Sequence, residues 1–226
     1  NGSDEYKYEG PEPTFGDWLA YDQTDKRYIS VAYYAYDAQI MAKMSAALSH
    51  DNDDLYARKS AKYNELFKNI RNEFQQRYFA DGKLKFETQT AFLLALKFNL
   101  LINDEQKAYA KKRLEELITK NGERLSTGFL GTTTLNQTLS EFGLSDKAYN
   151  LLLQRQNPSW LYPIDQGATT MWERWNSYTK DKGFGDSGMN SFNHYAYGAV
   201  GEWLFRYMAG ISFDVQQPGF KHIILQ

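Results

Sequence analysis

The chain has 226 residues, 42% of them hydrophobic, and no cysteine, which provides enough apolar material for one sizeable core and gives no indication of disorder. Its 26 basic and 28 acidic side chains leave a formal charge of −2, so electrostatics favours neither nucleic acid nor an anionic membrane as a partner. The longest mostly apolar run, residues 91–101, contains Lys97 and Asn99 and is too short to span a bilayer, so we expect no membrane helix.

The N-terminal residues 1–14 are polar and carry Gly10-Pro11 and Pro13, a composition that predicts an arm or linker. The aromatic segment FGDWL follows at residues 15–19. Its Trp18 either plugs the end of a helical core or contacts a ligand, and the local sequence favours neither interpretation.

The next part of the chain predicts a helical hairpin. A first helix is expected over residues 30–48, because apolar residues recur there at helical spacing. The residues of this stripe are Tyr33, Tyr36, Ile40, Met44 and Leu48. Residues 51–53 should cap a second, amphipathic helix that reaches Phe74 and lies on the outside of the fold.

Two further pairs of helices follow the turn at Asp81-Gly82. Residues 87–90 open a third helix whose apolar run at 91–96 must be surrounded by protein. Asn103-Asp104 caps a solvated fourth helix, which should stop at Asn121-Gly122. A fifth helix is predicted over residues 131–142, and Ser145 is expected to cap a sixth.

The last part of the chain contains a long loop, a seventh helix and a strand. Residues 190–194 are expected to open the helix, which runs to Gly210. Pro218-Gly219 predicts a turn, and residues 220–225 a short strand.

Buried helices thus alternate with amphipathic ones, which predicts an all-α fold of helical hairpins in a two-layer ring or solenoid. The buried helices open with polar clusters at residues 87–90, 132–134 and 190–194. If the inner helices begin at one end of a ring, these clusters line a single polar mouth, which is the default place for a ligand. Alternatively, the clusters are simply helix caps.

Glu173 stands out among the acidic residues, because Trp172 and Trp175 flank it in the segment GATTMWERW at residues 167–175. Partial burial between indoles would suit this carboxyl group to proton transfer. Indole faces also provide flat apolar surface for the C–H face of a sugar. The alternative is that both Trp residues belong to the core and that Glu173 forms a structural ion pair with Arg174 or another cation.

The segments GATTMWERW at 167–175 and NHYAYGAV at 193–200 resemble the bacterial α-L-rhamnosidases of the inverting type, glycoside hydrolase family 78. Four shorter segments agree with the same family, namely GDWL at 16–19, ETQTA at 87–91, LSTGFLGT at 125–132 and PGF at 218–220.

The resemblance implies an (α/α)6 barrel, of which residues 15–210 form an incomplete ring with catalytic groups at the N-terminal ends of the inner helices. Residues 211–226 would begin a C-terminal β region. It also implies a bacterial protein, periplasmic, secreted or cytoplasmic, that needs no cofactor and acts on a rhamnose-containing glycoside or polysaccharide.

Residue roles follow from the same resemblance. Glu173 matches the general base, which activates the water that attacks the anomeric carbon, and His194 matches a sugar-binding His. The remaining candidates for the sugar subsite are Trp18, Trp172 and Trp175, then Asp17 and Thr132.

The general acid is not among these residues. An inverting hydrolase needs a second carboxyl group across the sugar, roughly 6.5 to 9.5 Å from the base. In the family it lies in an Asp-x-x-x-Arg-Asp-Glu-Arg-like segment before the matched region, and residues 1–226 contain no such segment. About seven of twelve helices of a full ring are predicted. Exposed apolar flanks should then favour a homodimer or association with a missing upstream segment.

Two other functions remain open. A non-catalytic carbohydrate-binding module would keep the Trp residues and His194 without needing Glu173. Another (α/α)-barrel enzyme, such as a polysaccharide lyase, would use Tyr, His and Arg to abstract a proton. His50 and His222 are expected on the surface or in a strand, and no spacing of residues predicts a metal site. The Gly-rich run at 183–188 is predicted to be a mobile loop beside the site.

Overall fold

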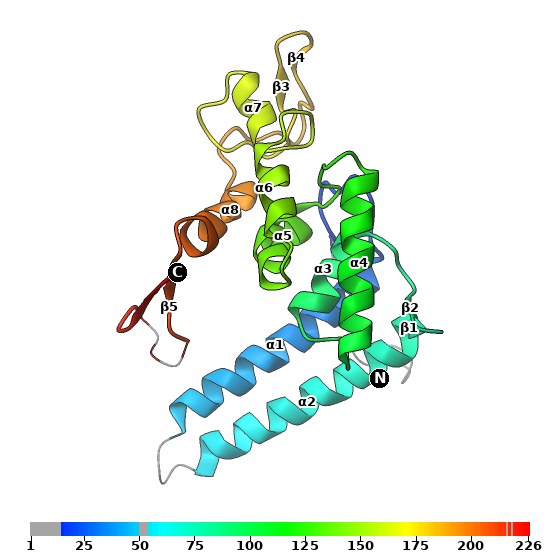
Figure 1. Cartoon of the computed structure of the whole chain (residues 1–226), viewed down its shortest axis with the longest axis vertical. Helices are drawn as coiled ribbons and strands as arrows, with labels where there is room; N and C mark the ends of the chain where they lie inside the picture. The colour runs from blue at the N-terminus through cyan, green and yellow to red at the C-terminus, as the bar shows by residue number, and fades with distance from the viewer. Residues whose placement is uncertain (1–14, 50–53, 216, 218) are drawn as a thin grey trace. The chain divides into compact units, whose positions relative to one another are not determined.

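The computed structural model describes residues 15–49, 54–215, 217 and 219–226 (Figure 1). They form two compact units, one of residues 15–18 and 22–114 and the other of residues 19–21 and 115–226. The predicted arm at 1–14, the predicted caps at 51–53 and His50 lie outside the described residues. None of the helices in the described part of the chain is both long and apolar enough to cross a membrane.

The first unit is built on a long helical hairpin followed by a shorter one. Its elements are α1 (Lys26–Leu48), α2 (Asp54–Tyr78), the antiparallel pair β1 (Phe79–Ala80) and β2 (Lys83–Leu84), α3 (Gln89–Lys97) and α4 (Asp104–Lys120), in which the division between the units falls. The predicted turn at Asp81-Gly82 joins the two strands, and both of its residues have positive φ.

The buried face of α1 differs from the predicted one. The helix begins at Lys26 rather than Ser30, because the Asp25 carboxylate caps it by accepting backbone N–H groups. The predicted stripe is wrong at its C-terminal end, where Met44 is 55% and Leu48 50% exposed, whereas Tyr33, Tyr36 and Ile40 are partly buried. Small residues are buried instead, and they are Ala35, Ala38, Ala42 and Ser45. Ser60 of α2 donates a hydrogen bond to the Ala42 carbonyl (3.0 Å), so α2 lies against this small-residue face.

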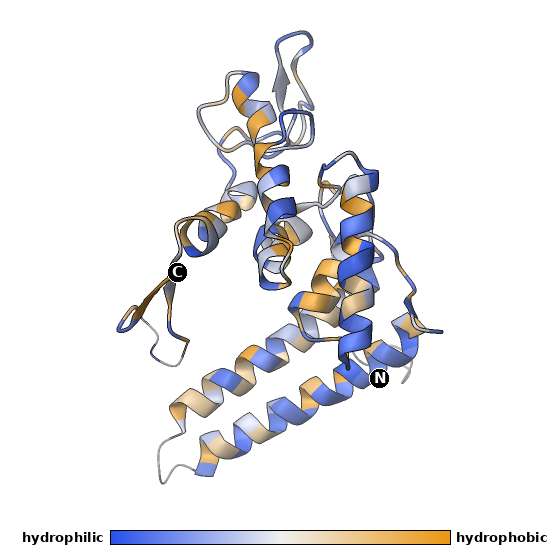
Figure 2. Ribbon diagram, in the orientation of Figure 1, coloured by the Kyte–Doolittle hydropathy of each residue, from blue (hydrophilic) through white to orange (hydrophobic). Residues whose placement is uncertain are grey.

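The predicted enclosed helix is confirmed. Every residue of α3 from Gln89 to Leu96 is buried, and Figure 2 shows that α3 is more apolar than α2. The helix is capped by Thr88, whose Oγ1 accepts the Ala91 N–H (3.1 Å). Tyr28 of α1 packs against α3, and its hydroxyl donates a hydrogen bond to the Ala91 carbonyl (2.7 Å). This bond links α3 to α1 within the core.

The second unit contains one regular hairpin and a series of short elements. These are α5 (Phe129–Glu141), α6 (Ser145–Leu153), α7 (Leu161–Asp165), β3 (Tyr178–Thr179), β4 (Gly183–Phe184), the 3-10 helix η2 (Ala196–Ala199), α8 (Val200–Trp203), the π-helix η3 (Leu204–Met208), β5 (Ile211–Phe213) and β6 (Ile223–Leu225). The pairs β3–β4 and β5–β6 are antiparallel.

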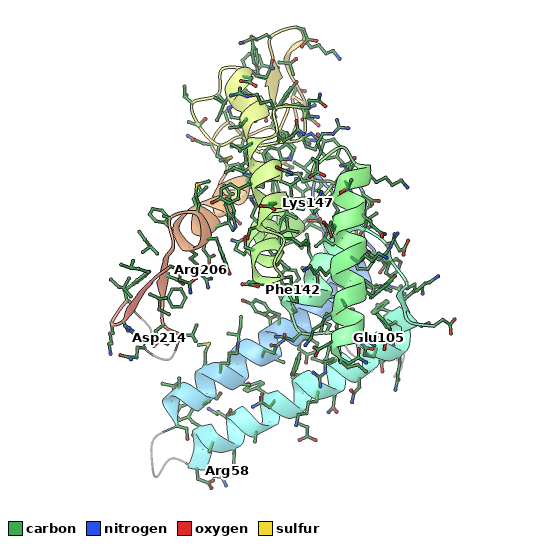
Figure 3. All side chains as sticks on the ribbon, in the orientation of Figure 1. Arg58, Glu105, Phe142, Lys147, Arg206 and Asp214 are labelled. Carbon is green, nitrogen blue, oxygen red and sulfur yellow. The ribbon has the colours of Figure 1, made fainter. Side chains whose placement is uncertain are left out.

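An ion pair closes one side of this hairpin. Lys147 of α6, labelled in Figure 3, lies 2.6 Å from the Glu123 carboxylate, which follows α4. Although burial opposes the charged form, hydrogen bonds from Lys147 and Asn150 lower the pKa of Glu123.

Three boundaries in the second unit correct the sequence predictions. α5 begins at Phe129 rather than at residue 131, and Ser145 is the first residue of α6 rather than its cap. Its hydroxyl donates to the Ser140 hydroxyl (3.2 Å). The predicted helix start at 190–194 is wrong, because regular helical structure begins only at Ala196. Part of the predicted mobile loop, Gly183–Phe184, is strand β4.

Candidate active site

The two segments that resemble the rhamnosidases lie side by side in the second unit. The His194 N–H donates to the Met171 carbonyl (2.9 Å), and the Glu173 N–H donates to the Ser191 carbonyl (2.8 Å). The Thr170 hydroxyl adds a hydrogen bond to the Phe192 carbonyl (2.5 Å). Residues 170–173 and 191–194 are therefore joined in antiparallel register, and this pairing replaces the helix start that the sequence predicts there.

The Glu173 carboxylate is held by the same neighbour. Its Oε2 accepts the Ser191 N–H at 2.8 Å, and the residue is 6% exposed. Within the described residues, Oε1 has no hydrogen-bond partner, so this oxygen can accept a proton from a water molecule. One oxygen thus orients the group and the other can do chemistry.

Arg174 does not neutralise Glu173. Its guanidinium lies 3.3 Å from the Asp186 carboxylate and donates to the Met189 carbonyl (2.8 Å). No cation in the described part of the chain pairs with Glu173. The predicted alternative of a structural ion pair is therefore not what the structure contains.

Asp186 is the acidic partner of Arg174, and its environment favours the charged form. The backbone N–H groups of Gly188 (2.7 Å) and Met189 (3.2 Å), and then the charge of Arg174, lower the pKa of Asp186. A carboxyl group held ionised in this way is not suited to donate a proton near neutral pH.

His194 presents one ring nitrogen for hydrogen bonding. Its Nδ1 accepts the Ala196 N–H (3.3 Å), so the neutral ring carries its proton on Nε2 and can donate it to a hydroxyl group. The imidazole packs between Phe129 (ring centroids 4.8 Å apart) and Tyr195 (5.3 Å). Because Phe129 is the first residue of α5, His194 lies at the N-terminal end of that helix.

The two indoles that flank Glu173 have different surroundings. Trp175 is 2% exposed and stacks on Tyr197 (centroids 3.7 Å apart, planes at 16°), with Trp160 against its edge. Its Nε1–H has no hydrogen-bond partner among the described residues. Trp172 packs edge-on against Phe192 (5.2 Å). Trp175 therefore supports the site from the core, whereas Trp172 belongs to a separate aromatic cluster.

The other candidates lie at the starts of two helices. In the second unit, the buried Thr132 hydroxyl bonds with that of Thr127 (2.8 Å) in the first turn of α5. In the first unit, Asp17 is fully buried and accepts the Thr90 hydroxyl (2.5 Å) at the start of α3, while Trp18 is 37% exposed. Glu173, Trp172, Trp175, His194 and Thr132 thus lie in one unit, and Asp17 and Trp18 lie in the other.

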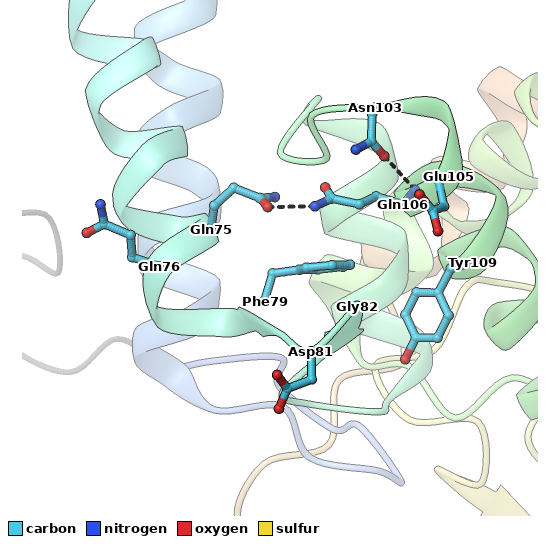
Figure 4. Close-up of a pocket in the computed structure, with 9 residues that line it drawn as sticks. All are labelled: Gln75, Gln76, Phe79, Asp81, Gly82, Asn103, Glu105, Gln106 and Tyr109. Carbon is cyan, nitrogen blue, oxygen red and sulfur yellow. Dashed lines mark hydrogen bonds between the residues drawn. The ribbon is translucent and has the colours of Figure 1, made fainter.

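A pocket of about 580 Å³ lies in the first unit and is lined by residues between Gln75 and Tyr109 (Figure 4). Gln75, Phe79, Gln106 and Tyr109 are among its lining residues, and no predicted site residue lines it. Its amides serve structure, since Gln75 donates to the Leu100 carbonyl (2.7 Å) and Gln106 donates to Gln75 (2.8 Å). We therefore place the candidate active site at Glu173 rather than here.

Sequence reasoning missed the groups that position the site. The Ser191 N–H holds Glu173, and the Phe129 ring supports His194. Almost every residue type has a backbone N–H, so the identity of residue 191 does not reveal its role as a donor. Phe129 lies 65 residues before His194, so no local pattern could have identified that contact either.

The comparisons with known proteins identify the family of the chain. A family model described as the bacterial alpha-L-rhamnosidase 6 hairpin glycosidase domain matches residues 1–208. An alpha-L-rhamnosidase of Streptomyces avermitilis is 46% identical over 218 residues, which are 96% of this chain and 20% of the relative. One of Formosa agariphila is 42% identical over 220 residues, 93% of this chain and 23% of the relative.

Solved structures give the same result. The crystal structure of the Streptomyces avermitilis alpha-L-rhamnosidase complexed with L-rhamnose matches with a TM-score of 0.88 and 44% identity, covering 99% of this chain and 21% of that one. The alpha-L-rhamnosidase structure from Aspergillus terreus matches with a TM-score of 0.85 and 36% identity, and the match covers 92% of this chain and 24% of that one.

The fold and the matches define a glycosidase domain of the six-hairpin (α/α) class, as predicted. The chain belongs to the bacterial α-L-rhamnosidase six-hairpin glycosidase family. It spans about a fifth of the length of the curated relatives that it matches.

Proposed function

We propose that this chain supplies the general base and part of the sugar subsite of an inverting glycoside hydrolase that releases L-rhamnose from rhamnosides. The observation that carries the proposal is the Glu173 carboxylate, with Oε2 held by the Ser191 N–H at 2.8 Å. Because this bond fixes the group, Oε1 can receive a proton without reorientation of the side chain.

In the proposed step, Glu173 Oε1 takes a proton from water as the water oxygen bonds to the anomeric carbon. The bond from that carbon to the leaving oxygen breaks on the opposite face of the sugar, and the leaving oxygen receives a proton from a carboxylic acid. We assign the acid to a part of the protein outside residues 1–226, so the chain alone should be weakly active or inactive.

The remaining candidates bind and orient the sugar in this proposal. His194 donates from Nε2 to a rhamnose hydroxyl, and Trp172 offers an indole edge next to the base. Trp175 backs the subsite from the core. We also assign Thr132, in the first turn of α5, to the subsite, and we assign Asp17 and Trp18 to it on the sequence resemblance alone. Residues 15–210 act as part of the (α/α) barrel, and β5–β6 begin a β region.

A graft tests this proposal. The chain replaces the matched segment of the Streptomyces avermitilis relative, to which it is 46% identical, and the hybrid is incubated with an aryl α-L-rhamnoside while proton NMR follows the first product. We expect free L-rhamnose that appears first as the β anomer. First appearance of the α anomer would contradict the proposed inversion. An unsaturated sugar product would indicate a lyase instead, and sugar binding without hydrolysis would indicate a binding module.

A further inference from the structure

The pocket of about 580 Å³ in the first unit has a wall that is fixed by hydrogen bonds of its own. Gln106 Nε2 donates to Gln75 Oε1 (2.8 Å), and Gln106 Oε1 accepts the Ile102 N–H (2.9 Å). Gln75 Nε2 donates in turn to the Leu100 carbonyl (2.7 Å). These bonds use one N–H of each side-chain amide, and a primary amide has two. This amide pair is therefore held in place, and each member has a further N–H to donate.

Two aromatic rings line the same pocket. Phe79 of β1 and Tyr109 of α4 meet edge to face, with ring centroids 6.2 Å apart and planes at 89°. Tyr109 also packs against Phe92 of the buried helix α3 (5.9 Å). Figure 4 shows the Phe79 ring between the amide pair and the β1–β2 turn. The core thus supports both rings, and they give the pocket a rigid apolar wall.

The remaining polar groups of the pocket are both acceptors and donors. Gln76, Asp81 and Glu105 line it and have no hydrogen-bond or ion-pair partner in the part of the chain that the structure describes. Asn103 accepts the Gln106 N–H through Oδ1 (2.8 Å), which leaves its Nδ2 to donate. The lining residues include no Lys, Arg or His. The pocket therefore offers carboxylate acceptors, amide donors and phenyl surface together.

This combination of groups selects the class of ligand. Two carboxylates without a cation repel an anion, and a purely apolar ligand would cover polar groups without bonding them. A cation would satisfy the carboxylates but accepts no hydrogen bond from the amides. A sugar hydroxyl donates and accepts, and the C–H face of a sugar ring packs on an aromatic ring. The volume lies within the roughly 300 to 1,000 Å³ of small-molecule sites.

We propose that this pocket is a non-catalytic binding site for a neutral sugar. The ring of the sugar lies on Phe79, and its hydroxyl groups bond to Asp81, Glu105 and the side-chain amides. The site binds rather than reacts, because both carboxyl groups belong to exposed residues and stay solvated. The inference goes beyond the proposed function, since it uses none of the residues assigned to hydrolysis.

NMR titration of the isotope-labelled chain with L-rhamnose, and separately with D-glucose, tests the site. We expect at least one of these sugars, at millimolar concentration, to shift the side-chain amide signals of Gln76 and Asn103. Phe79→Leu should raise the Kd from these shifts about 3- to 10-fold, and Asp81→Asn about 2- to 10-fold. The matched control Asp37→Asn changes an exposed carboxylate of α1 that does not line the pocket, and it should leave the Kd unchanged.

The proposal is overturned if neither sugar shifts the signals of Gln76 and Asn103, or if only a cation such as L-arginine amide does so. An unchanged Kd in both pocket variants would also overturn it. If circular dichroism shows that Phe79→Leu alters the fold, the comparison of Asp81→Asn with the control decides alone. Signals of Trp172 and His194 in the L-rhamnose titration report separately on the proposed active site, so failure of one proposal is distinguishable from failure of the other.

Discussion

At the scale of single residues, the orientation of Glu173 depends on one backbone donor. The Ser191 N–H is the partner of Oε2, and the Ser191 carbonyl accepts the Glu173 N–H. This reciprocal pair fixes both the main chain and the side chain of the proposed base, so residue 191 holds Glu173 through its peptide group, while its hydroxyl accepts the Asn193 N–H (3.2 Å).

Two substitutions of Ser191 therefore distinguish the contribution of its backbone N–H from that of its hydroxyl. Ser191→Pro removes the N–H, and we expect hydrolysis of an aryl rhamnoside by the graft to fall about 100-fold, mostly in kcat, because a misplaced catalytic group is costly. Ser191→Ala keeps the N–H and should retain most of the activity. Similar losses in both variants would mean that the hydroxyl matters instead.

His194 is expected to bind rather than to transfer a proton. His194→Ala removes the Nε2 donor, and we expect the Kd for L-rhamnose to rise about 2- to 10-fold, the effect of one hydrogen bond. His194→Gln retains a donor and should recover part of the affinity. Calorimetric titration measures both, and an unchanged Kd in His194→Ala would remove the residue from the subsite.

At the scale of elements, the first unit depends on Tyr28 beneath α3. Its ring lies 5.1 Å from those of Phe74 and Tyr78, and its hydroxyl bonds the Ala91 carbonyl. Burial, and then the neighbouring Tyr78, raise the pKa of Tyr28 well above that of a free phenol. The native state therefore favours the neutral hydroxyl, and alkaline solution acts against it.

The pH dependence of stability follows from the sign of that shift. Because the native pKa of Tyr28 is raised, its contribution is fully present below about pH 10, the pKa of an unfolded tyrosine, and is lost progressively above it. Tyr28→Phe should cost about 1 kcal/mol at pH 7 and reduce the loss of stability above pH 10. Urea unfolding between pH 7 and 11 measures this. An identical alkaline loss in the variant would exclude Tyr28 as its source.

Sequence patterns predicted some elements well and others poorly, for physical reasons. α3 was predictable because a helix that is apolar on all sides must be enclosed. The buried face of α1 was not, because close approach of α2 favours small side chains such as Ala38 and Ala42, while periodicity gave weight to large ones such as Met44. The cluster at 190–194 resembles a helix cap in its local sequence. Its backbone pairs instead with residues 170–173, about 20 residues earlier, and pairing over that distance leaves no local sequence pattern.

At the scale of the whole molecule, α1 carries an exposed apolar face on the first unit. Its large side chains are Tyr34, Met41, Met44 and Leu48, spaced so that they share one side of the helix. A contiguous patch of this kind favours association. We predict that a second copy of the chain covers this face when the chain is produced alone.

Self-association of the chain tests this patch. Sedimentation velocity should detect species larger than the monomer at micromolar concentrations, and the double variant Met44→Lys, Leu48→Lys should shift the distribution to monomer. The matched control Lys43→Met adds an apolar residue beside the patch and should not weaken association. A purely monomeric wild-type chain at all concentrations would contradict the proposal.

The central claim is that Glu173 deprotonates the attacking water. Its most direct test is Glu173→Gln in the graft, with hydrolysis of 4-nitrophenyl α-L-rhamnoside and the Kd for L-rhamnose measured on the same preparation. We predict a loss of hydrolysis of about 10²- to 10⁴-fold with an unchanged Kd. Hydrolysis at the rate of the unmutated graft would contradict the account.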